Sequence, residues 1–195
     1  MENKERELVL CKFLLQKYAD IINEREQRTI GEIKSLVDGT DLSVQNLLEE
    51  FKEDFYEFKN NYDQTLRKVY TFILDEIDVV EINLGVNYWL SAKEVLEQKV
   101  VDDEDLAVFT CACMKGLGDD KAEVIIAELD DLKTHAFVST ELGGNFLILD
   151  PAQKHDFDKY LGNKVDIIKN YVYNQTKIKR FLYRFNSEKY EQFLE

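Results

Sequence analysis

The sequence has little proline and glycine for its length. It contains one proline and eight glycines among 195 residues, so it offers few places for a flexible linker. No low-complexity segment and no fixed-period repeat interrupts it. These shortages exclude small domains strung on linkers. With 45% hydrophobic residues the chain can bury a sizeable core, and one continuous folded body is expected.

Cysteine is also scarce. The three cysteines are Cys11, Cys111 and Cys113, an odd number, and the last two are separated by a single residue. That spacing supports neither a disulfide framework nor a C-x-x-C zinc site. Free cysteine behaves as a small apolar residue, so we expect reduced thiols that are mostly buried.

Long hydrophobic runs and an excess of positive charge are missing as well. The start of the chain is charged, and no apolar stretch approaches the roughly 20 residues of a membrane helix. The expectation is a soluble, cytoplasmic protein without a membrane partner. The formal charge of −14 repels phosphate backbones, so no nucleic-acid partner is expected. Basic and aromatic residues do mix over 171–185, but alternating aromatics more often build core than a nucleic-acid surface.

Hydrophobic periodicity divides the chain into helices followed by strands. Helices are predicted over 5–24, 30–37, 43–61 and 63–80, and the pair Ser91 and Glu94 predicts a capping box before a short helix. A further helix is predicted over 103–114. Strands are predicted over 121–129, 134–140 and 145–149, with Gly143 and Gly144 as a hairpin turn. The predicted class is α+β.

Three short segments carry a family resemblance. They are Val101-Asp102-Asp103-Glu104-Asp105-Leu106-Ala107, Thr134-His135-Ala136-Phe137-Val138 and Leu147-Ile148-Leu149-Asp150-Pro151. Together they resemble the transglutaminase-like superfamily, in which Gly-Asp-Cys-Glu/Asp-Asp-x-Ala opens a helix with the nucleophile, a later strand supplies His and the next supplies Asp. The resemblance places Asp103 at the nucleophile, His135 at the base and Asp150 at the orienting acid.

A fourth segment adds to the likeness. The family often places Trp-x-Thr-Pro-x-Glu-x-Leu ahead of the nucleophile, and Trp89, Glu94 and Leu96 match it while Ala92 replaces the proline. The resemblance covers residues 86–155. It implies N-terminal helices followed by a papain-like helix and antiparallel sheet. We therefore expect a helical region over 1–82 packed on a transglutaminase-like domain over 83–195, as one continuous structural unit.

The resemblance implies an enzyme frame without its usual chemistry. In an active member a cysteine at a helix N-terminus becomes a thiolate, and histidine serves as its base. Asp103 is a far weaker nucleophile, and Cys111 and Cys113 lie about 12 to 15 Å farther along the same helix. A second register, with Gly118 at the cysteine position, leaves too few residues before His135 and also lacks cysteine. The leading interpretation is a catalytically inactive domain used for protein binding or assembly.

Other interpretations stay open at this point. The acidic run around Asp103 can be only a helix start, because acids complement the helix dipole there. Alternatively, Asp103, His135 and Asp150 serve a hydrolase of altered type, acting on an amide or peptide bond, with a metal as one option. A third alternative is an unrelated α+β structural protein. We predict no cofactor and no bound metal, a protein or peptide partner, and a possible homo-oligomer through the N-terminal helices.

Overall fold

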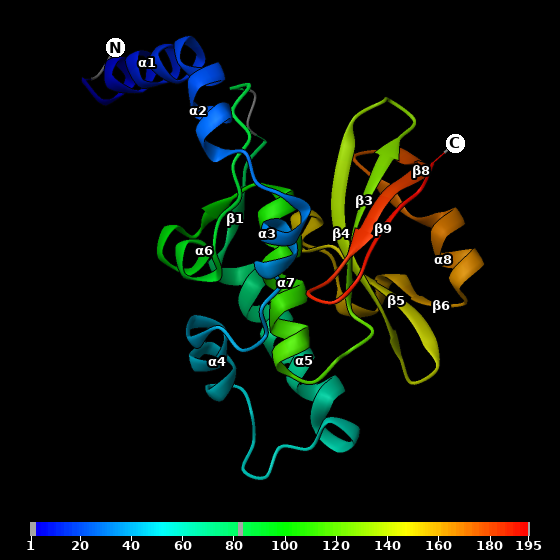
Figure 1. The fold of residues 1–195 in the computed structure, drawn as a ribbon. Coiled ribbons are helices and arrows are strands. Elements are labelled where there is room, and N and C mark those ends of the chain that lie inside the picture. The colour runs from blue at the N-terminus through cyan, green and yellow to red at the C-terminus, as the bar shows by residue number, and fades with distance from the viewer. Residues whose placement is uncertain (1–2, 82–83, 195) are drawn as a thin grey trace.

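The computed structural model describes residues 3–81 and 84–194 (Figure 1). Its helices are α1 (Asn3–Lys17), α2 (Ala19–Glu26), α3 (Ile30–Ser35), α4 (Leu42–Glu49), α5 (Phe58–Glu76), α6 (Ala92–Gln98), α7 (Asp103–Gly116) and α8 (Lys164–Asn170). The strands are β1 (Asp78–Val79), β2 (Val100–Val101), β3 (Glu123–Leu129), β4 (Thr134–Leu142), β5 (Asn145–Leu149), β6 (Leu161–Gly162), β7 (Val172–Tyr173), β8 (Thr176–Phe185) and β9 (Tyr190–Gln192). Two short 3-10 helices, Pro151–Gln153 and Phe157–Tyr160, follow β5.

Most of the strands join one antiparallel sheet. Within the described ranges its order is β6-β5-β4-β3-β8-β7, with β9 added on β8. The tight turn at Gly143 and Gly144 connects β4 to β5, and both glycines have positive φ, as a two-residue hairpin loop requires. β1 and β2 form a separate parallel pair just before α7.

Alternate residues of the sheet face two different layers. Val124 and Ile126 of β3 belong to the main core, which the sheet shares with α4, α5 and α7. Ile125 and Phe137 belong to a smaller core on the opposite face, beneath α8. Figure 1 shows α7 between the sheet and helices α4 and α6, with α8 on the other side of the sheet. Since strand side chains alternate between faces, this arrangement explains why most residues of β3 and β4 are buried.

The expected α+β class with a helix and antiparallel sheet core is confirmed. The helix predicted over 103–114 and the three predicted strands form close to their expected bounds, and the capping box of Ser91 and Glu94 is present. The main core draws on residues of both predicted regions. The division placed at 82 and 83 lies outside the described residues, so it stays a prediction. None of the helices in the described ranges is long and apolar enough to cross a membrane.

The N-terminal helices differ from their predicted bounds. The helix predicted over 5–24 is interrupted at Tyr18, whose ψ of 13° departs from helical values. The apolar stripe predicted to run to 61 spans two helices, because α4 already ends at Glu49. Phe55 lies outside both helices, with φ 62° and a 96% exposed side chain. At the other end, α5 stops at Glu76 because Asp78 and Val79 pair with β2.

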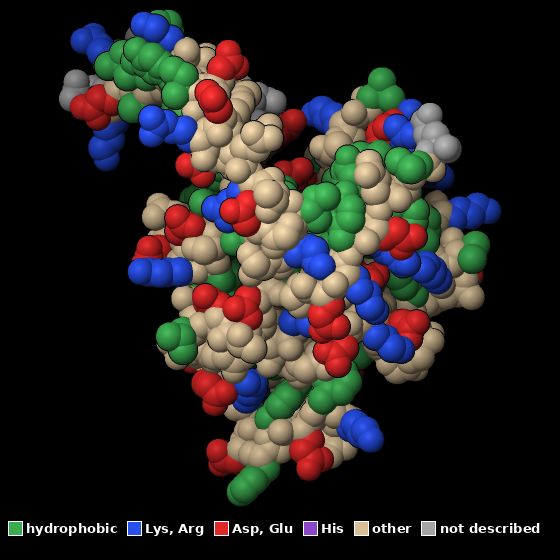
Figure 2. Space-filling model, in the orientation of Figure 1, with side chains coloured by type: hydrophobic (Ala, Val, Ile, Leu, Met, Phe, Trp, Pro, Cys, Tyr) green, Lys and Arg blue, Asp and Glu red, His purple; other side chains and the backbone are tan. Residues whose placement is uncertain are grey.

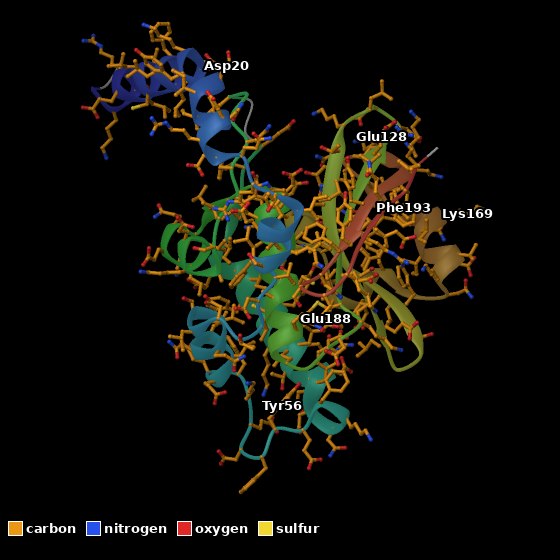
Figure 3. The ribbon with its side chains drawn as sticks, viewed as in Figure 1. Asp20, Tyr56, Glu128, Lys169, Glu188 and Phe193 are labelled. Atoms are coloured by element: carbon orange, nitrogen blue, oxygen red, sulfur yellow. The ribbon has the colours of Figure 1, made fainter. Side chains whose placement is uncertain are left out.

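Three contacts near the end of α7 hold the helices on the core. Gly39 lies against the end of α7, where an added Cβ would come within 2.4 Å of the Gly116 nitrogen. Buried Asp119, just after α7, accepts hydrogen bonds from the hydroxyls of Tyr62 on α5 and Thr140 on β4. Tyr56, labelled in Figure 3, donates to the carbonyl of Leu117 at 2.7 Å. The C-terminal end of α7 is thereby fixed both to the helices and to the sheet. This orients the N-terminus of α7 toward the start of β4.

Candidate functional site

The N-terminus of α7 presents Asp103. Asp102 is the N-cap, and its carboxylate accepts a hydrogen bond from the amide of Asp105 at 2.9 Å. Asp103 is therefore the first residue of the helix, and its side chain is free of the capping role. This is the position that the family resemblance assigns to the nucleophile.

The hairpin of β4 and β5 brings His135 to Asp150. Pairing of the two strands extends only as far as Val138 with Leu149, so His135 and Asp150 lie where the strands have separated. His135 Nε2 is 2.9 Å from Asp150 Oδ2, and both side chains are fully buried. The expected meeting of these two residues therefore occurs, although beyond the last paired residues.

Asp103 completes a three-residue cluster. Its Oδ2 is 2.6 Å from His135 Nδ1 and accepts the amide of Ala136 at 2.9 Å. Because β5 has ended at this level, the carboxylate takes the place of a strand neighbour for that amide. The Asp103 side chain stays 25% exposed, while the imidazole between the two acids has no exposure. The structure thus brings together all three residues singled out by the sequence.

The two carboxylates hold His135 in its charged form. Burial alone would lower the pKa of His135, but the hydrogen bonds and charges of Asp103 and Asp150 outweigh it and raise this pKa to about 9. Ionised carboxylates only accept hydrogen bonds, so contacts at both ring nitrogens describe an imidazolium. Such a ring has no lone pair with which to take a proton from a nucleophile.

Residues after β5 complete the surroundings of Asp150. Its Oδ2 also accepts from the Tyr171 hydroxyl at 2.5 Å and the Gln153 amide at 2.6 Å. Burial opposes ionisation of Asp150, yet His135 and these donors lower its pKa. The ring of Tyr173 is stacked on His135. Sequence reasoning included Tyr171 and Tyr173 only in the basic and aromatic C-terminal segment. Their two-residue spacing, which places both on one side of an extended chain, was the available signal.

The remaining acids of the run have other partners. Asp105 is buried and accepts the amide of Leu90 at 2.8 Å, which anchors the segment ahead of α6. Burial, together with neighbouring carboxylates, raises the pKa of Glu104 to about 7 and that of Asp105 to about 8. A helix start therefore accounts for Asp102 and not for the whole run. Each acid has a separate environment.

The cysteines lie away from His135. Cys111 and Cys113 are buried deeper in α7, and burial raises the pKa of both thiols. Two of the three thiols are therefore buried, as expected, and Cys11 is the exposed one because α1 does not pack into the core. Both nitrogens of His135 contact carboxylates.

A small cavity opens at Asp103. It has a volume of about 90 Å³, and Val79, Thr134 and Tyr173 are among its lining residues. Pockets for small-molecule ligands usually measure roughly 300 to 1,000 Å³, so the space admits a few waters or one small side chain. Among the residues that the structure describes, no group of three or more His, Cys, Asp or Glu side chains is placed to hold a metal ion.

The architecture of this chain is similar to that of solved structures. No family model matches the sequence, and no curated protein does so. Among solved structures, Legionella pneumophila LapG treated with EGTA is similar, with a TM-score of 0.53 and 18% identity over 94% of this chain and 86% of that one. A second structure of LapG gives a TM-score of 0.53 and 18% identity over 93% and 87%. The fold is papain-like. At this level of identity the likeness shows the fold alone.

Proposed function

We propose that this chain is a catalytically inactive transglutaminase-like domain that acts as a protein-binding or assembly module. The observation that carries the proposal is the position of His135 between Asp103 and Asp150, with 2.6 Å and 2.9 Å from its two ring nitrogens to carboxylate oxygens. The papain-like frame is retained while the groups required for acyl transfer are not assembled. A frame kept without that chemistry is well suited to binding.

Two chemical reasons support the absence of acyl transfer. A carboxylate that attacked an amide would have to form a mixed anhydride, and it is a much poorer nucleophile than a thiolate. A base must also be unprotonated at the working pH, whereas the pKa of His135 is raised to about 9. In this arrangement the histidine is an ion-pair partner that fixes the start of β4 against the start of α7.

One observation favours a second candidate. Asp103 is 25% exposed and faces the cavity, and Glu104 beside it has a pKa raised to about 7 by burial and by nearby carboxylates. An acid with a pKa near 7 is suited to general acid-base chemistry. A hydrolase of altered type, acting on an amide or peptide bond through Asp103, His135 and Asp150, is the alternative function.

The two functions differ in their response to the same substitutions. The protein, Asp103→Asn and His135→Ala would be incubated with a peptide library, and cleavage would be followed by mass spectrometry. If the domain is inactive, none of the three proteins cleaves peptides above the buffer background. Each partner that cross-links to the unmodified protein should also cross-link to both variants. Cleavage by the protein that both variants lose would establish the hydrolase instead. Asp103→Asn keeps the side-chain volume and separates chemistry from folding.

A further inference from the structure

The N-terminal arm, defined as α1 and α2 (residues 3–26), extends away from the rest of the molecule (Figure 1). No described side chain of α1 is buried, and neither is any residue of α2. Yet residues 8–15 read Leu-Val-Leu-Cys-Lys-Phe-Leu-Leu, apolar on nearly every side of the helix. Leu8 is 71% exposed and Phe13 56%. A helix of this composition is normally buried, so the arm requires a partner surface.

The base of the arm is fixed to the body. The Asn23 side chain donates to the carbonyl of Gly85 at 2.8 Å and accepts the amide of Asn87 at 2.7 Å. Arg28 donates to the carbonyl of Trp89 at 3.0 Å. These bonds set the direction of α2. Asp20, labelled in Figure 3, lies on this helix, away from the sheet. The arm is therefore directed away from the surface of its own body.

An apolar groove lies close to the base of the arm. It has a volume of about 380 Å³ and runs between α3 and the strands β8 and β9. Ile33, Trp89, Tyr183 and Tyr190 line it, and its charged lining residues are Lys34 and Glu104. Figure 2 shows hydrophobic side chains on this face beside α3, and a second hydrophobic group on the arm. The molecule thus carries an unpartnered apolar helix and an unfilled apolar groove.

Charge indicates which molecule supplies the missing surface. α1 carries four basic and two acidic side chains, although the whole chain has a formal charge of −14. The body outside α1 is therefore strongly acidic, and a basic helix is attracted to the body of another copy. The groove also lies near the base of the arm, because Ile30 and Ile33 line it and follow α2 closely. With 15 residues, α1 is about 22 Å long.

We propose that two copies of this chain exchange arms, so that α1 of each packs into the groove between α3 and β8 and β9 of the other. This inference rests on the proposed assembly function and names the partner as a second copy. The exchange buries the apolar side chains of both arms in one two-fold symmetric interface. It also covers Trp89 and Glu104, next to the His135 cluster.

Molar mass in solution tests the exchange. Light scattering on the full chain is expected to give twice 22.9 kDa. Leu14→Asp on the arm and Tyr190→Asp in the groove are each expected to halve that mass. Leu42→Asp is the matched control, because Leu42 is 78% exposed but belongs to neither surface, and this variant is expected to remain a dimer. A monomeric full chain would overturn the inference.

The cysteines provide a positional test. Cys11 lies on α1, whereas Cys111 and Cys113 are buried, so Cys11 is the thiol available for cross-linking in the folded chain. Under mild oxidation, Gln192→Cys in the groove is expected to form a disulfide with Cys11 of the second copy. A dimer that keeps its mass in Tyr190→Asp and links Cys11 to Cys11 would instead show arm-to-arm pairing. Exposure of Cys111 to labelling would identify a variant that has merely unfolded.

Three further outcomes separate this inference from the alternatives. Flotation of the full chain with phosphatidylserine vesicles, lost in Leu14→Asp without any dimer in solution, would overturn the exchange in favour of a membrane surface. Peptide cleavage that depends on Asp103 would overturn the proposed inactivity whatever the molar mass. A monomer with no cleavage would leave the inactive site intact and remove only the arm exchange. Mass and cleavage therefore report on the two proposals separately.

Discussion

The phenol ring of Tyr173 lies flat on the imidazole of His135, with ring centroids 3.5 Å apart and planes inclined by 16°. An aromatic face attracts a cation, so this contact favours the charged ring already held by two carboxylates. It also shields one face of the imidazole from solvent. The protonated state of His135 is therefore supported from three directions.

The first prediction concerns the titration of His135. Two-dimensional NMR of the ring should show a pKa of about 9 in the unmodified protein, and a lower pKa in Asp103→Asn because one charged acceptor is lost. His155 is an internal reference, since burial lowers its pKa below the usual 6.5 and Asp103 does not contact it. An unchanged His135 titration in the variant would contradict the 2.6 Å contact.

The second prediction is a loss of stability with rising pH. The pKa of His135 is about 9 in the folded state and 6.5 in the unfolded state, so its contribution is complete below pH 6.5 and disappears as pH rises through 9. A shift of this size corresponds to roughly 3 kcal/mol at most. Glu104 and Asp105 act in the same direction, because their raised pKa values of about 7 and 8 make the folded state retain protons that the unfolded state releases.

Urea denaturation below pH 6.5 and above pH 9 would measure this loss. His135→Gln removes the titrating ring and should reduce the loss between those limits, while the part due to Glu104 and Asp105 remains up to about pH 8. The lowered pKa of Asp150 has the opposite sign, since its contribution is present above the unfolded value of 3.8 and is lost only as pH falls below it. A stability that rises from neutral to alkaline pH would contradict the charged cluster.

The third prediction tests the frame by restoring a thiol. Asp103→Cys, made together with Cys11→Ser, should be alkylated by iodoacetamide faster than an ordinary exposed cysteine, because a helix N-terminus and a neighbouring histidine favour thiolate. Intact-mass spectrometry would give the rate. The same protein with His135→Gln added is the control and should react more slowly. Equal rates would mean that the imidazole does not act on position 103.

The fourth prediction concerns buried Asp119. Tyr62→Phe removes one of its two hydroxyl donors and should lower the free energy of unfolding by about 1 to 3 kcal/mol. Tyr56→Phe is the matched control. Tyr56 donates to a backbone carbonyl in a partly buried position, so its loss should cost less. Chemical denaturation of both variants would rank them, and a larger effect at Tyr56 would be the contrary result.

The fifth prediction concerns the approach of Gly39 to α7. Gly39→Ala would place a methyl group 2.4 Å from the Gly116 nitrogen, so the backbones must separate, and overpacking of this kind costs about 1 to 3 kcal/mol. Gly31→Ala, in α3, meets nothing nearer than the Thr29 hydroxyl at 3.8 Å and should be neutral or stabilising. Thermal unfolding should therefore separate the two glycines. Equal melting temperatures would contradict the contact.

The elements that the sequence predicts well are those with local signals. The α7 helix has its acidic start, the β4 and β5 hairpin has two glycines, and the cap of α6 has Ser91 and Glu94 at the required spacing. The same local information places Asp103, His135 and Asp150 at the ends of neighbouring elements. Their roles remain predictions, since the likeness to solved structures shows fold and not chemistry.

Non-local packing decides what the sequence does not predict. The apolar spacing around Phe55 continues a helical stripe, but the chain turns outward there with positive φ. Tyr171 and Tyr173 reach His135 and Asp150 only because β7 pairs with β8 and returns beside the start of β4. The exposure of α1 could not be foreseen either, because its apolar periodicity is that of a buried helix.

The bond between Asp103 and the amide of Ala136 also makes the start of α7 a hydrogen-bonding partner of the sheet. An apolar side chain at position 103 would leave that amide without its acceptor and would leave His135 with one carboxylate contact in place of two. Both losses would weaken the fold. Stability alone therefore constrains position 103, independently of any chemistry in the groove.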